Sequence, residues 1–355
     1  MIKTPFCSIY FSLCMMFFIP TLYAAPMVKK DTVMVGQFFS KTKPQCAGIY
    51  VMDVPESFNN ETHKATYDDF DIESKFIYPP AFKQRIELRE EALRQQKTSQ
   101  KNAPVLKEVI RLPDNQGVIF DRNISGQDDL GRILEAHVYL NHIAFIITTE
   151  ILDLSSPKYM ERKKTYINAG FTEAEMNDKP TKLAAMRSLV SRLSGRLDHE
   201  IPADKGWCIP NGFIADDGGQ HKIEVGFSYE NDDFLFGINA NNTMVDNNDT
   251  LFGRSDAIND ALKASSMKTL KKYASRVHGI PFEAWLFDGT KNYKQKTQQV
   301  YDFILYANES VASTSKLLAT IGLNSKRKQT RYSEAQMVEI WDRVIGSLRY
   351  KPNAF

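Results

Sequence analysis

Apolar residues in the first half of the chain follow two kinds of pattern. Runs that are continuous or alternating, as in buried strands, predict strands over residues 46–55, 117–121, 135–140 and 144–152. Apolar residues three or four positions apart predict amphipathic helices over residues 82–96 and 182–197. Asn141 separates the last two strands and is the expected place for a turn.

The second half shows the same two patterns. Strands are predicted over residues 208–216, 222–229, 234–239, 284–288 and 298–307, and helices over residues 255–277 and 333–348. The last helix has the clearest beginning, because Ser333 and Gln336 have the spacing of a capping box.

The two halves carry similar landmarks in the same order. These landmarks are Cys46 and Cys208, Gly48 and Gly212, Asp53 and Asp216, and the tripeptides IFD and LFD that end at Asp121 and Asp288. We therefore predict an α+β fold of two related domains, each a mainly antiparallel sheet packed with helices. The polar stretch 201–206 is the expected boundary, which gives domains of residues 26–203 and 204–355. The alternative is a chance similarity between two β-rich stretches.

The first 25 residues have the pattern of a secretory signal peptide. Lys3 carries a positive charge, residues 6–23 are mostly apolar, and Ala24 and Ala25 are the small residues expected at a cleavage site. A membrane anchor is the alternative, but this apolar run is at the short limit for a span. The pattern thus predicts an exported mature chain, and no later apolar run reaches membrane-spanning length.

The charge of the chain narrows the classes of partner. The formal net charge is +2 without a basic tail or cluster, which argues against a nucleic-acid partner.

Cys46 and Cys208 are the cysteines that remain after the signal peptide. In an oxidising compartment they could form one disulfide, and two separate buried thiols are an equal alternative.

Motifs for catalysis and for metal or cofactor binding are missing from the sequence. It contains no G-x-S-x-G, H-E-x-x-H, zinc-ribbon cysteine pairs, G-x-G-x-x-G or phosphate loop. His137 and His142 lie in apolar strands, where packing is the expected role. Asp246, Asn248 and Thr250 have the alternate spacing of a calcium loop, but Leu251 replaces its glycine and Ala257 its final glutamate. We therefore predict no catalytic, metal or cofactor residues.

Cys208 and two acidic stretches remain as candidates. Pro210 disfavours a helix beginning at Cys208, and nothing ties His199 to this thiol, so KGWCIPNGFIADDGG is interpreted as the entry to a strand rather than a nucleophile loop. The acidic stretches 68–71 and 230–233 are candidate surfaces for a partner, with solvated loops as the alternative.

Two stretches carry a resemblance to a known family. The strand CAGIYVMDVP (46–55), and above all GWCIPNGFIADD (206–217), resemble the immunity proteins for phospholipase effectors of type VI secretion. Within them the chain looks like the fourth group of Tle-cognate immunity proteins, which have separate N-terminal and C-terminal domains. The resemblance covers nearly the whole mature chain.

The resemblance implies a periplasmic protein without catalytic activity that binds and neutralises a lipase effector. It identifies no partner-binding residue. Two other functions stay open from the residues alone: a periplasmic hydrolase that uses Asp53, Asp216 or His199, and an envelope scaffold protein.

Overall fold

The computed structural model describes residues 29–243, 249–293, 295–313, 315–325 and 330–355. The predicted signal peptide, residues 1–25, lies outside them. The first half consists of α1 (Lys29–Phe38), β1 (Thr42–Ala47), β2 (Tyr50–Pro55), β3 (Asn60–Tyr67), β4 (Phe70–Phe76), α2 (Pro79–Gln95), β5 (Leu106–Arg111), β6 (Gly117–Asn123), β7 (Gly131–Leu140), β8 (Ile143–Leu152), α3 (Met160–Asn168), α4 (Glu173–Met176), α5 (Lys179–Arg192) and β9 (Leu193–Gly195). The second half consists of β10 (Gly206–Ile209), β11 (Gly212–Ala215), β12 (Ile223–Glu230), β13 (Leu235–Asn241), α6 (Ser255–Ala264), β14 (Met267–Val277), β15 (Ile280–Tyr293), β16 (Lys296–Ala307), β17 (Leu318–Asn324), α7 (Glu334–Gly346) and β18 (Arg349–Tyr350).

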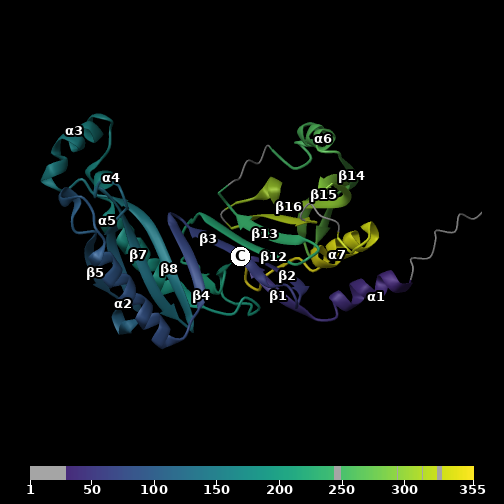
Figure 1. Cartoon of the computed structure of the whole chain (residues 1–355), viewed down its shortest axis with the longest axis horizontal. Coiled ribbons are helices and arrows are strands. Elements are labelled where there is room, and N and C mark those ends of the chain that lie inside the picture. Colours follow the sequence, from purple (N-terminus) through teal and green to yellow (C-terminus); the bar gives the residue numbers. More distant parts are fainter. Residues whose placement is uncertain (1–28, 244–248, 294, 314, 326–329) are drawn as a thin grey trace, which may run out of the picture.

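One antiparallel sheet of twelve strands runs through both halves (Figure 1). Its order is β14-β15-β16-β17-β13-β12-β3-β4-β8-β7-β6-β5. Read outward from the centre, β12-β13-β17-β16-β15-β14 repeats β3-β4-β8-β7-β6-β5 position for position. The equivalent strands β12 and β3 pair with each other at the centre. The two halves therefore have related strand orders, as the predicted duplication implies. They are related by an approximate two-fold axis and share one sheet, which the sequence did not predict.

Each half also contributes a hairpin to a small three-stranded sheet. The orders β1-β2-β18 and β10-β11-β9 are again equivalent. The β10–β11 hairpin lies on the first half, where Ser74 Oγ donates a hydrogen bond to Pro210 O (2.7 Å). The β1–β2 hairpin lies on the second half, where Asn308 Nδ2 donates to Tyr50 Oη (2.7 Å). Each hairpin therefore packs beside the sheet strands of the other half.

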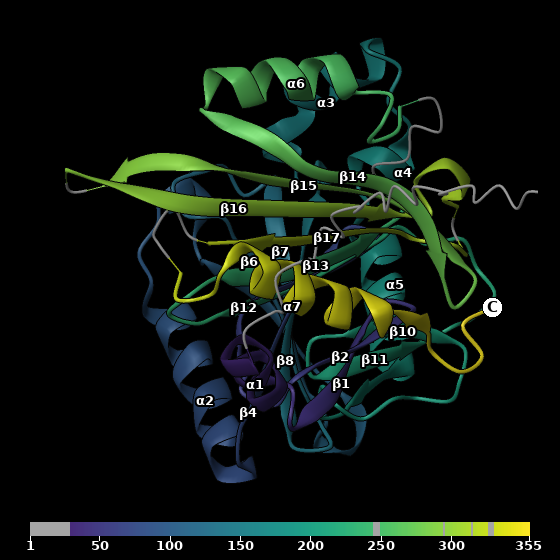
Figure 2. The ribbon, with the colours of Figure 1, turned by 90° about the vertical axis from the view of Figure 1, so that its right-hand side faces the viewer.

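A continuous hydrophobic core joins the halves. Its buried residues include Tyr50, Phe145, Phe227, Phe303 and Trp341, which come from both halves of the chain. Figure 2 shows α6 and α7 on opposite sides of the second-half strands. Among the described residues, no helix combines the length and the apolar character that crossing a membrane requires.

Most of the predicted elements are confirmed. Helices are found near residues 82–96 and 333–348, and the Ser333–Gln336 capping box is present. The strands predicted at 117–121, 135–140, 144–152, 222–229, 234–239, 284–288 and 298–307 are all present, several of them longer than predicted. Asn141 has a left-handed conformation between β7 and β8, as a tight turn requires.

Four predicted elements are wrong. Residues 46–55 and 208–216 are hairpins rather than single strands. In the first of them, Gly48 begins the turn with a φ of 59°. The predicted helix 182–197 ends at Arg192 and continues as β9.

The predicted helix 255–277 ends at Ala264, and Met267–Val277 form β14. A bulge between Thr269 and Lys271 shifts the alternation of this strand. Its half-buried residues therefore fall at positions 267, 270, 273 and 277, which imitates helical spacing.

The cysteine landmarks of the two halves are equivalent, whereas the glycines are not. Cys46 pairs with Val51, and Cys208 pairs with Phe213 at the same position of its hairpin. Gly48 lies within its turn, but Gly212 is the first residue after the corresponding turn. The predicted match of these two glycines is therefore off by two residues.

Candidate binding surface

The central strands present one polar side that none of the helices among the described residues covers. Asn241, Glu224, Thr66, Asp71 and Thr148 stand opposite one another on neighbouring strands from β13 to β8. Residues in such register project to the same side of a sheet. We call this side of β3, β4, β8, β12, β13 and β17 the uncovered face. Its side chains include Lys64, Thr66, Asp71, Glu73, Lys75, Thr148, Glu224, Ser228, Asn239, Asn241 and Thr320.

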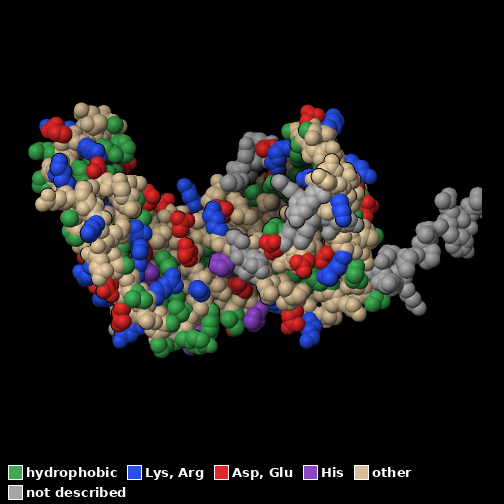
Figure 3. All heavy atoms as spheres, in the orientation of Figure 1, with side chains coloured by type: hydrophobic (Ala, Val, Ile, Leu, Met, Phe, Trp, Pro, Cys, Tyr) green, Lys and Arg blue, Asp and Glu red, His purple; other side chains and the backbone are tan. Residues whose placement is uncertain are grey.

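Helices border the uncovered face at both ends. At one end, Leu93 of α2 packs in a cluster with Phe120 of β6. At the other end, Ile258 and Leu262 of α6 pack against a cluster that contains Trp285 of β15. The space-filling view shows a hollow between the lobe that carries α3 and the lobe that carries α6 (Figure 3). The molecule thus offers a recessed, polar surface of the kind that a protein partner can enter.

Two pockets open on the uncovered face, one in each half. The second-half pocket has a volume of about 420 Å³ and is lined by Glu224, Asn239, Asn241, Asp249, Arg254, Tyr306, Glu309, Leu318 and Thr320. The first-half pocket has a volume of about 270 Å³ and is lined by His63, Glu73, Ser74, Lys75, Arg85, Ala144 and Ile146.

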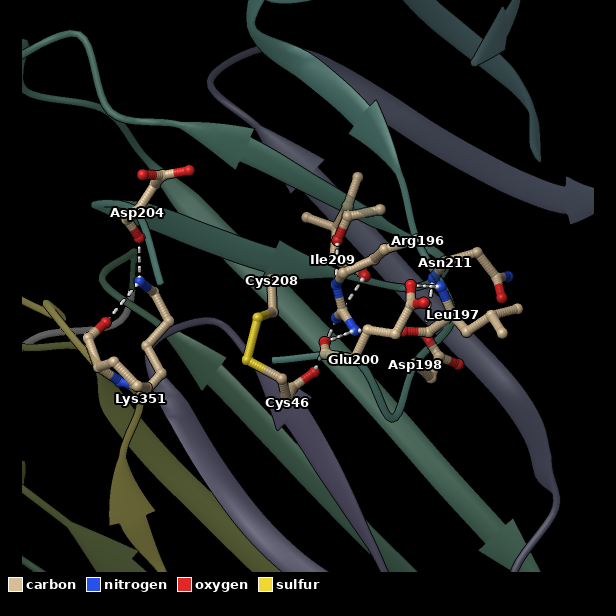
Figure 4. Close-up of a disulfide and its surroundings, with 12 residues drawn as sticks. Cys46, Arg196, Leu197, Asp198, Glu200, Asp204, Cys208, Ile209, Asn211 and Lys351 are labelled. Carbon is tan, nitrogen blue, oxygen red and sulfur yellow. Dashed lines mark hydrogen bonds between the residues drawn. A yellow bond between two sulfur atoms is a disulfide. The ribbon is translucent and has the colours of Figure 1, made fainter. Parts of the chain in front are cut away.

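A disulfide joins the two hairpins at the centre of the molecule. Cys46 and Cys208 are fully buried and are bonded to each other (Figure 4). Beside them, Gly48 and Cys208 exchange two backbone hydrogen bonds of 2.8 Å each. Of the two alternatives that the sequence left open, the structure contains the disulfide.

Arg196 connects five backbone carbonyls beside this disulfide. Its guanidinium donates to Gly212 O and Leu197 O (both 2.9 Å), Glu200 O (3.0 Å), Ile209 O (3.2 Å) and Cys46 O (3.3 Å) (Figure 4). Burial lowers the pKa of Arg196 to about 10, so the guanidinium remains charged at neutral pH. Because these carbonyls belong to both hairpins and to the connection between the halves, Arg196 holds the junction together.

Lys351 occupies the equivalent position in the other small sheet. The Arg196 amide donates to Asn211 O after β9, and the Lys351 amide donates to Ile49 O after β18. The Lys351 ammonium donates to Asp204 O and to Pro352 O. Burial lowers the pKa of this lysine to about 8. A buried cation thus stands on each side of the disulfide.

His221 links the chain entering β12 to the turn between β3 and β4. Its imidazole lies 2.8 Å from an oxygen of Asp68 and 2.8 Å from an oxygen of Asp217. Burial by itself lowers the pKa of His221, but the hydrogen bonds and charges of the two carboxylates outweigh it and raise the pKa above its usual value. The imidazolium is therefore the form that the folded protein favours.

We expect the stabilising effect of His221 to disappear at high pH. Since the folded-state pKa is raised, this contribution is complete below the unfolded pKa of about 6.5 and is lost as pH rises through the folded pKa. The His221→Gln variant should be about 1 kcal/mol less stable than wild type at pH 6, because the ion pairs are only partly shielded from water. Urea unfolding between pH 5.5 and 9 measures this difference, with His199→Gln at an exposed histidine as control. A difference that stayed constant or grew with pH would contradict the assignment.

The first half also contains a network of ion pairs around a third pocket, of about 260 Å³. Arg132 binds Asp121 (2.7 Å) and Asp153 (2.9 Å), and Lys179 binds Asp121 (2.7 Å). A separate group of charges lies on the other side of the sheet around Glu135. Although burial raises the pKa of Glu135, hydrogen bonds from Arg89 and His137 and the charge of Arg122 hold it well below its usual range. Because each of these charges meets an opposite charge, the network has a structural role.

The structure does not bring the hydrolase candidates together. Asp53 lies in β2 and forms an ion pair with Arg349 (2.9 Å), and Asp216 accepts a hydrogen bond from the Gly218 amide (3.0 Å). His199 is exposed. Within the described part of the chain, no hydrogen bond or ion pair joins any two of the three candidates.

The other sequence candidates have local roles. His137 is buried against Glu135, as predicted, whereas His142 lies in the β7–β8 turn rather than in a strand. In the calcium stretch, Asp246 and Asn248 lie outside the described residues. No group of three His, Cys, Asp or Glu side chains within the described ranges could hold a metal ion.

The acidic stretches are partly used inside the chain. Asp68 binds His221, Asp69 binds Lys182, and the buried Asp233 accepts a hydrogen bond from the Arg331 amide. These contacts leave fewer free carboxylates for a partner than the sequence suggests.

The uncovered face is the surface that the sequence did not reveal. The sequence indicates this face only through the polar residues at alternate positions of its strands, for example Glu224 and Asn239. Polar alternation only predicts a side that faces away from the core. Whether a helix covers that side depends on contacts between distant segments.

Comparison with known proteins gives a family match over both halves. Residues 43–196 match the model for the Tle cognate immunity protein 4 N-terminal domain, and residues 200–353 match that for the C-terminal domain. No curated protein matches the chain.

Two solved structures have the same fold. The apo structure of the immunity protein TplEi of T6SS from Pseudomonas aeruginosa is 19% identical, with a TM-score of 0.68 over 88% of this chain and 97% of that one. A crystal structure of the Tle4–Tli4 complex is 20% identical, with a TM-score of 0.67 over 88% of this chain and 98% of that one. These two structures show the fold. Because the two family models match residues 43–196 and 200–353, the chain belongs to the Tle cognate immunity protein 4 family.

Proposed function

We propose that this chain is a periplasmic immunity protein that binds a phospholipase effector of type VI secretion and inhibits it sterically, without being an enzyme itself. The observation that carries the proposal is the family match over both halves. The similar fold solved as a Tle4–Tli4 complex supports a Tle effector as the class of partner.

Export to the periplasm is part of this proposal. Residues 1–25 have the pattern of a cleavable signal peptide, and the Cys46–Cys208 disulfide suits an oxidising compartment. We place the boundary between the two domains at residues 203 and 204, in the connection that leads to β10.

Steric inhibition fits the shape of the molecule. A partner element that enters between the lobes can contact the uncovered face and both bordering helices (Figure 3). A permanent complex of this kind should bury on the order of 2,000 Å² or more. Lipase activity would then be lost because substrate no longer reaches the enzyme or because its mobile elements are held.

The test is a titration of the cognate Tle lipase effector with residues 26–355 of this chain. We expect phospholipase activity to fall in proportion to added protein and to reach its minimum at an equimolar ratio, with both chains unmodified by mass spectrometry. A lipase that stayed active in a saturated complex would rule out steric inhibition, and the absence of a complex would rule out the partner.

The Asp216→Asn variant serves as control in the same titration. A binder should inhibit as well as wild type, because this carboxylate bonds only locally. A hydrolase that depended on Asp216 should lose its effect while staying folded.

A further inference from the structure

The two pockets on the uncovered face are equivalent under the approximate two-fold axis. The floor of the second-half pocket includes Asn239 and Asn241 of β13, which stand opposite Thr320 and Leu318 of β17. The floor of the first-half pocket includes Glu73 and Lys75 of β4, opposite Ile146 and Ala144 of β8. Since β13 corresponds to β4 and β17 to β8, duplication has placed a pocket at the same position in each half.

The equivalent pockets differ in the sign of their charge. The second-half pocket contains three carboxylates (Glu224, Asp249 and Glu309) and one guanidinium (Arg254), a formal balance of two negative charges. The first-half pocket contains Lys75 and Arg85 with the single carboxylate of Glu73, a formal balance of one positive charge with His63 neutral.

The pockets also differ in how their charged groups are paired within the chain, because the carboxylates of the second-half pocket have partners there. Arg254 is already bonded to Glu309 (2.8 Å) and Asp249 (3.1 Å), which leaves Glu224 as the third carboxylate. Glu224 contacts Lys64 (2.8 Å), whose side chain is 58% exposed. In the part of the chain that the structure describes, neither Lys75 nor Arg85 forms an ion pair.

We propose that these oppositely charged pockets fix the orientation of the bound effector, which presents a lysine or arginine to the second-half pocket and an aspartate or glutamate to the first-half pocket. A face with two-fold symmetry would accept a partner element in two opposite orientations. Unlike charges attract the element in one orientation, and like charges oppose it in the other. This inference rests on the proposed function and adds the chemistry of the contact.

The experiment measures the affinity of charge-reversal variants of residues 26–355 for the lipase effector by calorimetry. Glu224→Lys and Arg85→Glu should each weaken binding by about tenfold or more, since each places a like charge against the partner. The double variant Lys64→Glu with Glu224→Lys restores the ion pair between β3 and β12 while it keeps the pocket reversed, so it should bind as weakly as the single variant. Glu56→Lys, at an exposed residue beyond β2, is the matched control and should bind within about twofold of wild type.

The outcomes separate the two proposals. If wild type binds and both reversed variants bind within twofold of it, the orientation proposal is wrong and the immunity proposal stands. If charge reversal weakens binding in only one of the two pockets, the proposal that both pockets orient the effector is likewise wrong. If wild type forms no complex with the lipase, both proposals fail.

Discussion

Replacing Arg196 with methionine should lower the free energy of unfolding by about 3 kcal/mol. The side chain is 7% exposed, and its guanidinium donates to five backbone carbonyls. Methionine fills a similar volume but donates no hydrogen bond, so acceptors such as Cys46 O and Ile209 O lose their partner in a place that water hardly reaches. Because these carbonyls belong to both hairpins, the loss should loosen the junction between the halves.

Urea unfolding of residues 26–355 with the disulfide intact measures this effect. Arg196→Lys should lower the free energy of unfolding by less than Arg196→Met, because an ammonium keeps the charge but offers fewer donors in a different geometry. Arg187→Met, at an exposed arginine of α5, is the matched control and should change stability by less than about 0.5 kcal/mol. An Arg196→Met midpoint equal to that of the control would show that the five hydrogen bonds contribute nothing net.

Elements with a clear local sequence signal were predicted correctly. The β7–β8 hairpin has two alternating runs and a turn asparagine, and α7 has a capping box and a clear apolar side. β3 has neither signal, because NETHKATY is mostly polar, and it was missed although it lies at the centre of the sheet. A strand of this kind is specified by its neighbours rather than by its own composition.

The duplication was visible in the sequence, but its spatial consequence was not. Cys46 and Cys208 marked equivalent hairpins, and Asp121 and Asp288 marked the equivalent strands β6 and β15. Nothing in those landmarks says that β3 pairs with β12 or that each hairpin packs beside the sheet of the other half. The uncovered face follows from these long-range pairings, and for that reason it could only be recognised in the structure.

Removing the Cys46–Cys208 disulfide should lower the free energy of unfolding more than any other substitution considered. The two residues are 162 positions apart, so the bond restricts a long loop of the unfolded chain, and the loop-entropy model gives about 5 kcal/mol. Measured effects are often smaller, and we expect a loss of about 3–5 kcal/mol for the Cys46→Ala, Cys208→Ala double variant. Alanine avoids placing a new hydroxyl at two fully buried positions.

Urea unfolding with and without reductant separates the covalent bond from side-chain packing. Wild type unfolded in reductant should approach the stability of the double alanine variant, whereas that variant should not respond to reductant at all. Because Cys46 and Cys208 are fully buried, the disulfide of the native wild type should be reduced only after the protein opens. The loss of stability in reductant should therefore develop slowly at low urea and quickly near the unfolding midpoint. Equal stability of oxidised wild type and the double variant would contradict this role and would leave Arg196 and the shared β3–β12 pairing as the elements that hold the halves together.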